Sequence, residues 1–214
     1  MDFSKIELVI FDLDGTLIDS AHDLASSLYL ALQDEGLFQH TIEDLTAKIG
    51  VGSKNLLKEL VNDDPIVEKR VFDYYIKRYS SNMFTNTKLF PFVPEILEKL
   101  TTKSVALVSN KREKPCVEIL KHFEIDHHFK MTLGGDSLAQ RKPHPAPLLH
   151  ICNTLAILPE KTVMIGDSPV DIDAGIAAGT QTIGILEGLT PPDVMKKSNA
   201  HFLIPKVGDL LPLL

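Results

Sequence analysis

The sequence has few of the features that mark secreted or membrane proteins. It holds two cysteines, Cys116 and Cys152, far apart and with no metal-ligand spacing, which favours reduced, buried thiols over a disulfide or a metal site. No apolar run approaches the roughly 20 residues that a transmembrane helix needs. The first residues, of mixed charge, do not resemble a signal peptide. We therefore expect a cytoplasmic protein with no membrane partner.

Positive charge is also scarce, with 22 Lys and Arg against 29 Asp and Glu and a formal net charge of −7. This balance argues against a nucleic-acid partner, although an anionic substrate can still bind a locally positive site. The sequence has no internal repeat, no low-complexity segment and no Walker motif, and the isolated Gly50-x-Gly52 is weak evidence for a nucleotide site. Its 214 residues, 44% of them apolar, indicate one large domain or a domain with an insertion.

Two kinds of pattern divide the chain. From residue 89 onward, apolar segments at about 104–108, 130–133, 162–165, 182–185 and 201–204 alternate with helical patterns, as does the run that begins at Leu8. Strands that alternate with helices predict an α/β fold with a doubly wound parallel sheet. Between about 20 and 82 only helical periodicity is visible. We predict a core formed by residues 1–17 and 89–214, and an inserted all-helical domain at 18–88.

Local motifs predict how the inserted helices begin. Ser20 with Asp23 has the form of a capping box, and Asp64-Pro65 has the form of an N-cap followed by proline at the first helical position. Tyr75 and Tyr79 lie on one face of the helix that follows, which we expect to pack inside the inserted domain.

Three of the apolar strands stop at polar residues: Asp12 and Asp14, Ser109 and Asn110, and Asp167 with Asp171. Alone, each is most simply a turn or a helix cap. Together they matter more, because the carboxyl ends of parallel strands share one rim, where ligands bind. Lys142 lies in a loop between the last two strands.

This set of side chains suits a divalent cation and a phosphate. Carboxylates about 4 Å apart repel by about 4 kcal/mol at an effective dielectric constant near 20, so they need a cation or raised pKa values. All-oxygen ligands favour Mg²⁺. Lys142, the Ser109 hydroxyl and backbone N–H groups at the strand ends would hold the phosphoryl oxygens.

The motifs Asp12-Leu13-Asp14-Gly15-Thr16-Leu17, Ser109-Asn110, Lys142-Pro143 and Gly166-Asp167-Ser168-x-x-Asp171 resemble, in this order, those of the haloacid dehalogenase superfamily. The resemblance covers nearly the whole chain. The insertion is similar to the helical cap of the phosphoglycolate phosphatase and β-phosphoglucomutase branch. Within that branch, segments 134–136, 142–145 and 209–214 look most like bacterial phosphoglycolate phosphatases. Two segments depart from the branch: Pro169-Val170 and the loop at 186–192.

The resemblance implies a role for each matching residue. Asp12 would be the nucleophile that forms an aspartyl-phosphate, and Asp14 the general acid and then the base. Mg²⁺ would be held by Asp12, the backbone carbonyl of Asp14 and Asp167, with Asp171 supporting Lys142. Substrate would be bound by a further set of residues: Gly15, Ser109, Asn110, Lys142 and Lys54.

The activity implied is Mg²⁺-dependent hydrolysis of a small phosphorylated metabolite, 2-phosphoglycolate first, by a monomer or weak homodimer. One alternative is a phosphosugar mutase of the β-phosphoglucomutase type, and another is a phosphatase acting on a sugar phosphate, a nucleotide or pyrophosphate. Phosphonate hydrolysis through a Schiff base on Lys54 is a further alternative. The segment 50–54 is either a turn between helices or a loop that selects the substrate. A phospho-accepting receiver domain is disfavoured, because its acidic pair and phosphorylated Asp lie on separate strands.

Overall fold

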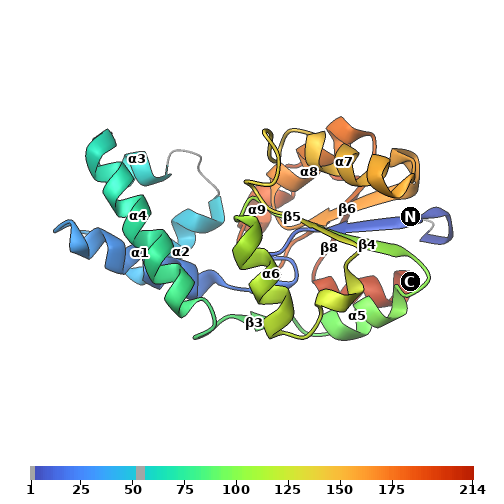
Figure 1. Ribbon diagram of the computed structural model, residues 1–214, viewed down its shortest axis with the longest axis horizontal. Helices are drawn as coiled ribbons and strands as arrows, with labels where there is room; N and C mark the ends of the chain where they lie inside the picture. The colour runs from blue at the N-terminus through green and yellow to red at the C-terminus, as the bar shows by residue number, and fades with distance from the viewer. Residues whose placement is uncertain (1–2, 52–55) are drawn as a thin grey trace.

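A computed structural model describes residues 3–51 and 56–214, and its centre is a six-stranded parallel sheet (Figure 1). The strand order is β5-β4-β1-β6-β7-β8. The strands are β1 (Leu8–Phe11), β4 (Ser104–Val108), β5 (Met131–Leu133), β6 (Thr162–Gly166), β7 (Gln181–Ile185) and β8 (Phe202–Ile204). The prediction of a parallel α/β sheet is confirmed.

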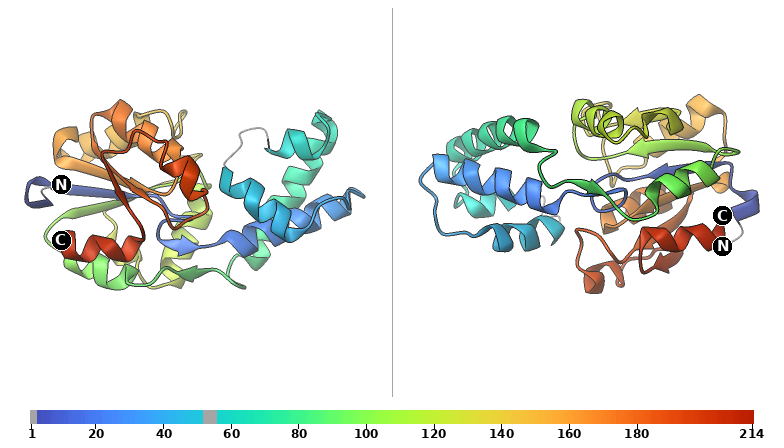
Figure 2. Two further views of the ribbon diagram at one scale, coloured as in Figure 1. Left: turned by 180° about the vertical axis from the view of Figure 1, so that it is seen from behind. Right: turned by 90° about the horizontal axis from the view of Figure 1, so that it is seen from below.

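Helices cover both faces of this sheet (Figures 1 and 2). Side chains alternate along β1, so that Val9 and Phe11 pack on one face and Leu8 and Ile10 on the other. The first face is covered by α5 (Val93–Lys99) and α6 (Glu113–His122), and the second by α7 (Ala146–Leu155) and α8 (Pro169–Ala178). A short helix, α9 (Pro192–Met195), follows β7. Because β1 is an interior strand of the sheet and is buried on both faces, the residues that follow it lie near the middle of the rim formed by the carboxyl ends of the strands.

The inserted segment forms a separate helical layer beyond that edge (Figure 1). Its helices are α1 (Ala21–Asp34), α2 (Ile42–Val51), α3 (Leu56–Leu60) and α4 (Pro65–Asn82), and they share a hydrophobic cluster of their own. The chain leaves and returns through an antiparallel pair of two-residue strands, β2 (Ile18–Asp19) and β3 (Lys88–Leu89). This pairing supports the predicted boundaries at 17/18 and 88/89, and the division into two domains stays a prediction. None of the described helices combines the length and the apolar character needed to cross a membrane.

The two predicted helix starts differ in outcome. At α4 the prediction is confirmed, since Asp64 Oδ1 accepts the N–H groups of Ile66 and Val67. At α1 the predicted start after Ser20 is confirmed, but the capping box is wrong, because the Ser20 side chain makes no capping hydrogen bond. The Ser20 hydroxyl instead donates to Asp14 at 2.6 Å, and Asp23 accepts hydrogen bonds from the segment that returns to the core. Tertiary partners therefore outcompete the local cap.

Candidate active site

A cavity of about 210 Å³ opens at the carboxyl ends of β1, β4 and β6. It is lined by most of the polar residues predicted for the site, namely Asp12, Asp14, Ser109, Asn110, Lys142, Asp167 and Asp171. From the helical layer, Ile49 of α2 also reaches it. We call this cavity the carboxylate pocket.

Lys142 is the cation at the base of this pocket, and its side chain is 2% exposed. Its ammonium group donates to Asp12 Oδ1 at 2.8 Å, to Asp171 Oδ1 at 2.6 Å and to the Val108 carbonyl at 2.6 Å. A lysine ammonium has three N–H donors, so these three acceptors use all of them. Lys142 therefore fixes the Asp12 carboxylate relative to the end of β4.

Asp171 holds Lys142 from the first turn of α8. Its Oδ1 takes the lysine hydrogen bond, and its Oδ2 accepts from both the N–H and the hydroxyl of Ser168. Because both oxygens already have donors, Asp171 suits a positioning role behind Lys142 better than a role as a ligand.

Asp167 is fixed by backbone donors from the loop after β7. The N–H groups of Leu189 and Thr190 donate to Asp167 Oδ2 at 2.7 and 3.2 Å. Gly15 lies so close that a Cβ added there would be 2.2 Å from the same oxygen, and its φ of +82° is itself a conformation that favours glycine. The structure thus places Gly15 against a carboxylate.

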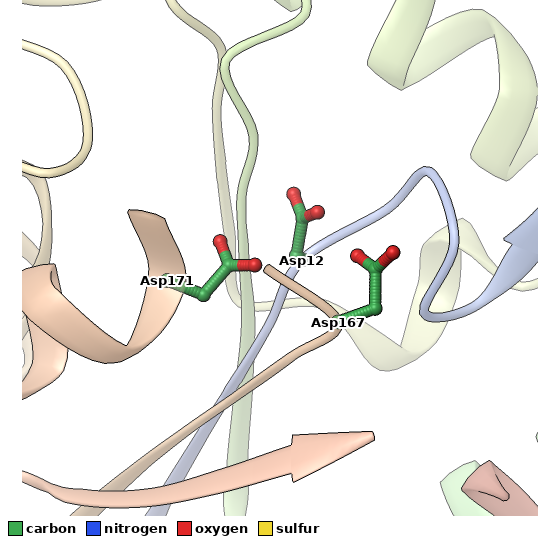
Figure 3. Close-up of side chains that lie close together, drawn as sticks. All are labelled: Asp12, Asp167 and Asp171. Atoms are coloured by element: carbon green, nitrogen blue, oxygen red, sulfur yellow. The ribbon is translucent and has the colours of Figure 1, made fainter. Parts of the chain in front are cut away.

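Three buried carboxylates, those of Asp12, Asp167 and Asp171, lie close together (Figure 3), in an arrangement that could hold a divalent cation. Within the described part of the chain, Asp12, Asp167 and Asp171 each offer an oxygen, and these oxygens lie within 4.8 Å of one another. Burial raises the pKa of Asp12 to about 6 against the opposing effect of Lys142, and burial with the neighbouring carboxylates raises the pKa of Asp167 well above its ordinary value. A cation would remove this cost of ionisation. The all-oxygen donor set fits Mg²⁺.

Asp14 faces the helical layer and has different neighbours. Its two oxygens each lie 2.8 Å from Lys111 Nζ, and Ser20 donates to Oδ1 at 2.6 Å. The Lys111 ammonium also lies over the ring of Tyr79, 4.4 Å from its centroid. Burial alone would lower the pKa of Lys111, but the Asp14 carboxylate outweighs it and raises that pKa. Tyr79 of α4 therefore contacts the core, which was not predicted.

Comparison with known proteins identifies the family. A model of haloacid dehalogenase-like hydrolases matches residues 9–185. The chain belongs to this family. This haloacid dehalogenase-like hydrolase is 34% identical over 211 residues to a phosphoglycolate phosphatase of Aquifex aeolicus, covering 98% of this chain and 97% of that protein. It is 39% identical over 193 residues to one of Psychrobacter arcticus, covering 85% and 84%.

The fold of this hydrolase matches that of a solved relative. The crystal structure of a predicted phosphoglycolate phosphatase from Haemophilus somnus superposes with a TM-score of 0.89 at 32% identity, covering 98% of each chain. The resemblance inferred from the motifs is therefore confirmed, and with it the prediction of an enzyme with a haloacid dehalogenase fold.

The remaining predicted residues of the hydrolase have clear positions, with one exception. Ser109 is buried and its hydroxyl accepts the N–H of Lys111, while Asn110 donates to the Lys142 carbonyl at 2.9 Å. Lys54 lies outside the described residues. Lys111, Leu189 and Thr190 were missed as site residues. Lys111 had a signal, since it directly follows the Ser109-Asn110 motif, whereas Leu189 and Thr190 act through backbone groups that no side-chain pattern marks.

Proposed function

We propose that the protein is a Mg²⁺-dependent phosphatase that hydrolyses a small phosphate monoester, 2-phosphoglycolate first, through an aspartyl-phosphate on Asp12. The observation that carries the proposal is the position of Asp12. Lys142 holds its Oδ1 at 2.8 Å, and no described residue donates a hydrogen bond to its Oδ2. The names of the two curated relatives support the choice of substrate.

In the first step, a carboxylate oxygen of Asp12 attacks phosphorus and the bond to the ester oxygen breaks. Asp14 donates a proton to the leaving alkoxide, so that an alcohol departs. In the second step, Asp14 accepts a proton from water as the water oxygen attacks phosphorus. The acyl-phosphate bond then breaks, and inorganic phosphate and the Asp12 carboxylate are released.

The surrounding residues prepare Asp12 and Asp14 for these steps. Lys142 orients Asp12 and offsets its charge, and Asp171 keeps Lys142 in place. A bound Mg²⁺, held by Asp12, Asp167 and the backbone carbonyl of Asp14, would supply positive charge to the transferring phosphoryl group. Ser109 and the backbone N–H groups near it are proposed to bind the phosphoryl oxygens.

The test is a panel of phosphate monoesters ranked by kcat/KM in Mg²⁺, with 2-phosphoglycolate, sugar phosphates, nucleoside monophosphates and pyrophosphate. We expect 2-phosphoglycolate to rank first, EDTA to abolish turnover and added Mg²⁺ to restore it. Mg²⁺ should also raise the thermal unfolding temperature, by an amount corresponding to about 2.7 kcal/mol at a concentration 100 times its Kd. Hydrolysis that persists in EDTA would contradict the proposed metal, and a panel with no hydrolysed ester would contradict the phosphatase.

We further propose a cytoplasmic monomer or weak homodimer in which residues 18–88 form a cap over the carboxylate pocket. Two free, buried cysteines support the location. Ile49 of α2, which lines the pocket from the helical layer, supports the cap. Light scattering on the purified protein would test the oligomeric state.

A further inference from the structure

A second cavity, of about 390 Å³, lies between α4 and the core beside α6. We call it the side pocket. Its walls include Phe72, Tyr75 and Ile76 of α4 and, from the core, Lys111, Arg112 and Arg141. It shares Asp14, Asn110 and Lys111 with the carboxylate pocket. A molecule whose ester oxygen meets Asp14 can therefore extend into the side pocket.

The charges of the side pocket favour an anion. Three cations line it, against the two carboxylates of Asp14 and Asp136. Asp14 is paired with Lys111 at 2.8 Å and Asp136 with Arg112 at 2.9 Å. The side chain of Arg141 makes no hydrogen bond or ion pair within residues 3–51 and 56–214, so one positive charge is left over. A cavity with an aromatic wall and surplus positive charge suits an organic anion.

Lys111 stands where the two cavities meet. Its side chain is 9% exposed, and its ammonium contacts Asp14 and the Tyr79 ring. The Tyr79 hydroxyl is buried in the same wall, and because the Lys111 ammonium beside it can only donate, the hydroxyl proton has no acceptor among the described residues. Buried hydroxyl groups normally have a partner, because burying one without compensation is costly. An acceptor oxygen on a bound molecule would satisfy it.

We propose that the side pocket binds the alcohol part of the substrate, and that Lys111 and Arg141 bind a carboxylate on it. The substrate class is then the phosphate monoesters of hydroxy acids. This inference rests on the proposed function, because it requires Asp14 to meet the leaving oxygen. The side pocket, at about 390 Å³, is also more than ten times the roughly 30 Å³ that one water molecule occupies in the liquid, so it has room for a hydroxy acid longer than glycolate. Esters of longer hydroxy acids should therefore also be substrates.

The experiment compares esters of matched length with and without the carboxylate: 2-phosphoglycolate with ethyl phosphate, and the phosphate ester of 3-hydroxypropionate with propyl phosphate. The ratio of kcat/KM within each pair measures the preference for a carboxylate. Both members of a pair need Asp14 equally, so the ratio separates binding of the carboxylate from proton transfer. We expect wild type to prefer the carboxylate in both pairs.

Arg141→Met and Lys111→Met should each lower this preference by roughly 10- to 100-fold, the range for a lost hydrogen bond to a charged group. Tyr79→Phe should lower it less. Lys114→Met is the matched control, since Lys114 lies on α6, its side chain is 86% exposed, and it does not line the side pocket. It removes the same charge from the same region and should leave both ratios unchanged.

A binding measurement separates the inference from the proposed chemistry. Calorimetry would compare binding of 2-phosphoglycolate to Asp12→Asn and to Asp12→Asn with Arg141→Met, with Mg²⁺ present. Binding weakened about tenfold or more by Arg141→Met supports the inference even if no ester is hydrolysed, an outcome that would contradict the proposed function alone. If the preference and the binding both survive Arg141→Met and Lys111→Met, the side pocket is not the site and the inference is wrong, while the phosphatase activity stands.

Discussion

The two sides of the carboxylate pocket hold their carboxylates in different ways. On the core side, Asp12 is held by Lys142, whose other acceptors are Asp171 and the carbonyl of Val108. All of these groups belong to the core: Val108 to β4, Asp171 to α8, and Asp12 and Lys142 to loops at the carboxyl ends of the strands. On the side that faces the helical layer, which we call the cap side, Asp14 is held by Ser20 and by Lys111. Ser20 directly precedes α1, and Lys111 lies over the ring of Tyr79 of α4.

The proposed nucleophile, Asp12, and the proposed proton donor, Asp14, are therefore held by different parts of the molecule. The contacts of Asp12 lie within the core, so they would survive a movement of the helical layer. The contacts around Asp14 span the core and that layer, so such a movement would change them. Lid movements commonly complete a catalytic site when substrate is bound. We infer that the cap acts on Asp14 and on the side pocket, and leaves the position of Asp12 unchanged.

The largest expected effect comes from removing the proposed nucleophile, Asp12, on the core side. Asp12→Asn should lower kcat for 2-phosphoglycolate by at least about 10³-fold, because no other carboxylate can replace the lost bond to phosphorus. The amide oxygen can still accept from Lys142, so the far-ultraviolet circular dichroism spectrum and the unfolding temperature should stay close to wild type. Substantial turnover by a folded variant would show that Asp12 is not the nucleophile.

A glycine pair tests how tightly the core side is built. Gly15→Ala and Gly36→Ala both place a side chain at positive φ, +82° and +74°, which costs about 1–2 kcal/mol of stability. Only at Gly15 does the new Cβ meet Asp167, at 2.2 Å, whereas nothing lies within 4 Å at Gly36. Displacing a site residue by about 1 Å can cost 10²-fold in rate.

We therefore expect Gly15→Ala to lower kcat/KM by roughly 10- to 100-fold and Gly36→Ala to leave it unchanged, while urea unfolding shows both variants destabilised. Equal kcat/KM values for the two variants would mean that Asp167 tolerates displacement, and that the core side is looser than its hydrogen bonds indicate.

The core side was also the more predictable of the two from sequence. β4 spans the predicted residues 104–108, and β1, β4 and β6 end at the polar residues that line the pocket. Buried parallel strands are visible as apolar runs, and their ends share a rim by the geometry of the fold. The grouping of the polar residues that follow these strands could therefore be predicted from the sequence alone.

The cap side could not be predicted in the same way, because its partners are distant in sequence. Lys111 forms an ion pair with Asp14, which lies 97 residues earlier in the chain. Asp23 accepts a hydrogen bond from Asn86, 63 residues later, although the local pattern of Ser20 and Asp23 predicts a helix cap. A capping hydrogen bond on a helix end is worth about 1 kcal/mol, so several buried partners can override it. Contacts that depend on how two units pack leave no periodic signal in the sequence.

The smallest expected effect on catalysis comes from Asp23, in the connection between core and cap. Its carboxylate accepts from the N–H and the Nδ2 of Asn86 and from the N–H and the hydroxyl of Thr87. It thereby ties the start of α1 to the segment that returns to β3. Asp23→Asn replaces one acceptor oxygen with a donor that faces these donors. We expect a loss of about 1–3 kcal/mol in the free energy of unfolding at pH 7.

The pH dependence of this loss distinguishes the carboxylate from a merely well-packed side chain. Burial pushes the pKa of Asp23 up, but the hydrogen bonds from Asn86 and Thr87 outweigh it and hold the pKa below its ordinary value of 3.8. Its contribution to stability is therefore complete above that value and is lost as the pH falls through the lower folded-state pKa. The difference in unfolding free energy between wild type and Asp23→Asn, from urea titrations between pH 7 and 3, should be constant at first and shrink below about pH 4.

Kinetic measurements on Asp23→Asn also test whether the core side and the cap side of the carboxylate pocket act independently, as their contacts indicate. With the tie between α1 and the return segment weakened, the helical layer changes position more easily, while Lys142 and Asp171 still hold Asp12. KM for 2-phosphoglycolate should then rise severalfold, because the cap side contributes to binding. The value of kcat should also fall, through the changed contacts of Asp14, but by a smaller factor than KM rises. A fall in kcat/KM as large as that expected for Gly15→Ala would show that the site depends on the cap as strongly as it depends on the core side. A gap in stability that stays constant down to pH 3 would show that the Asp23 charge is not what stabilises the connection.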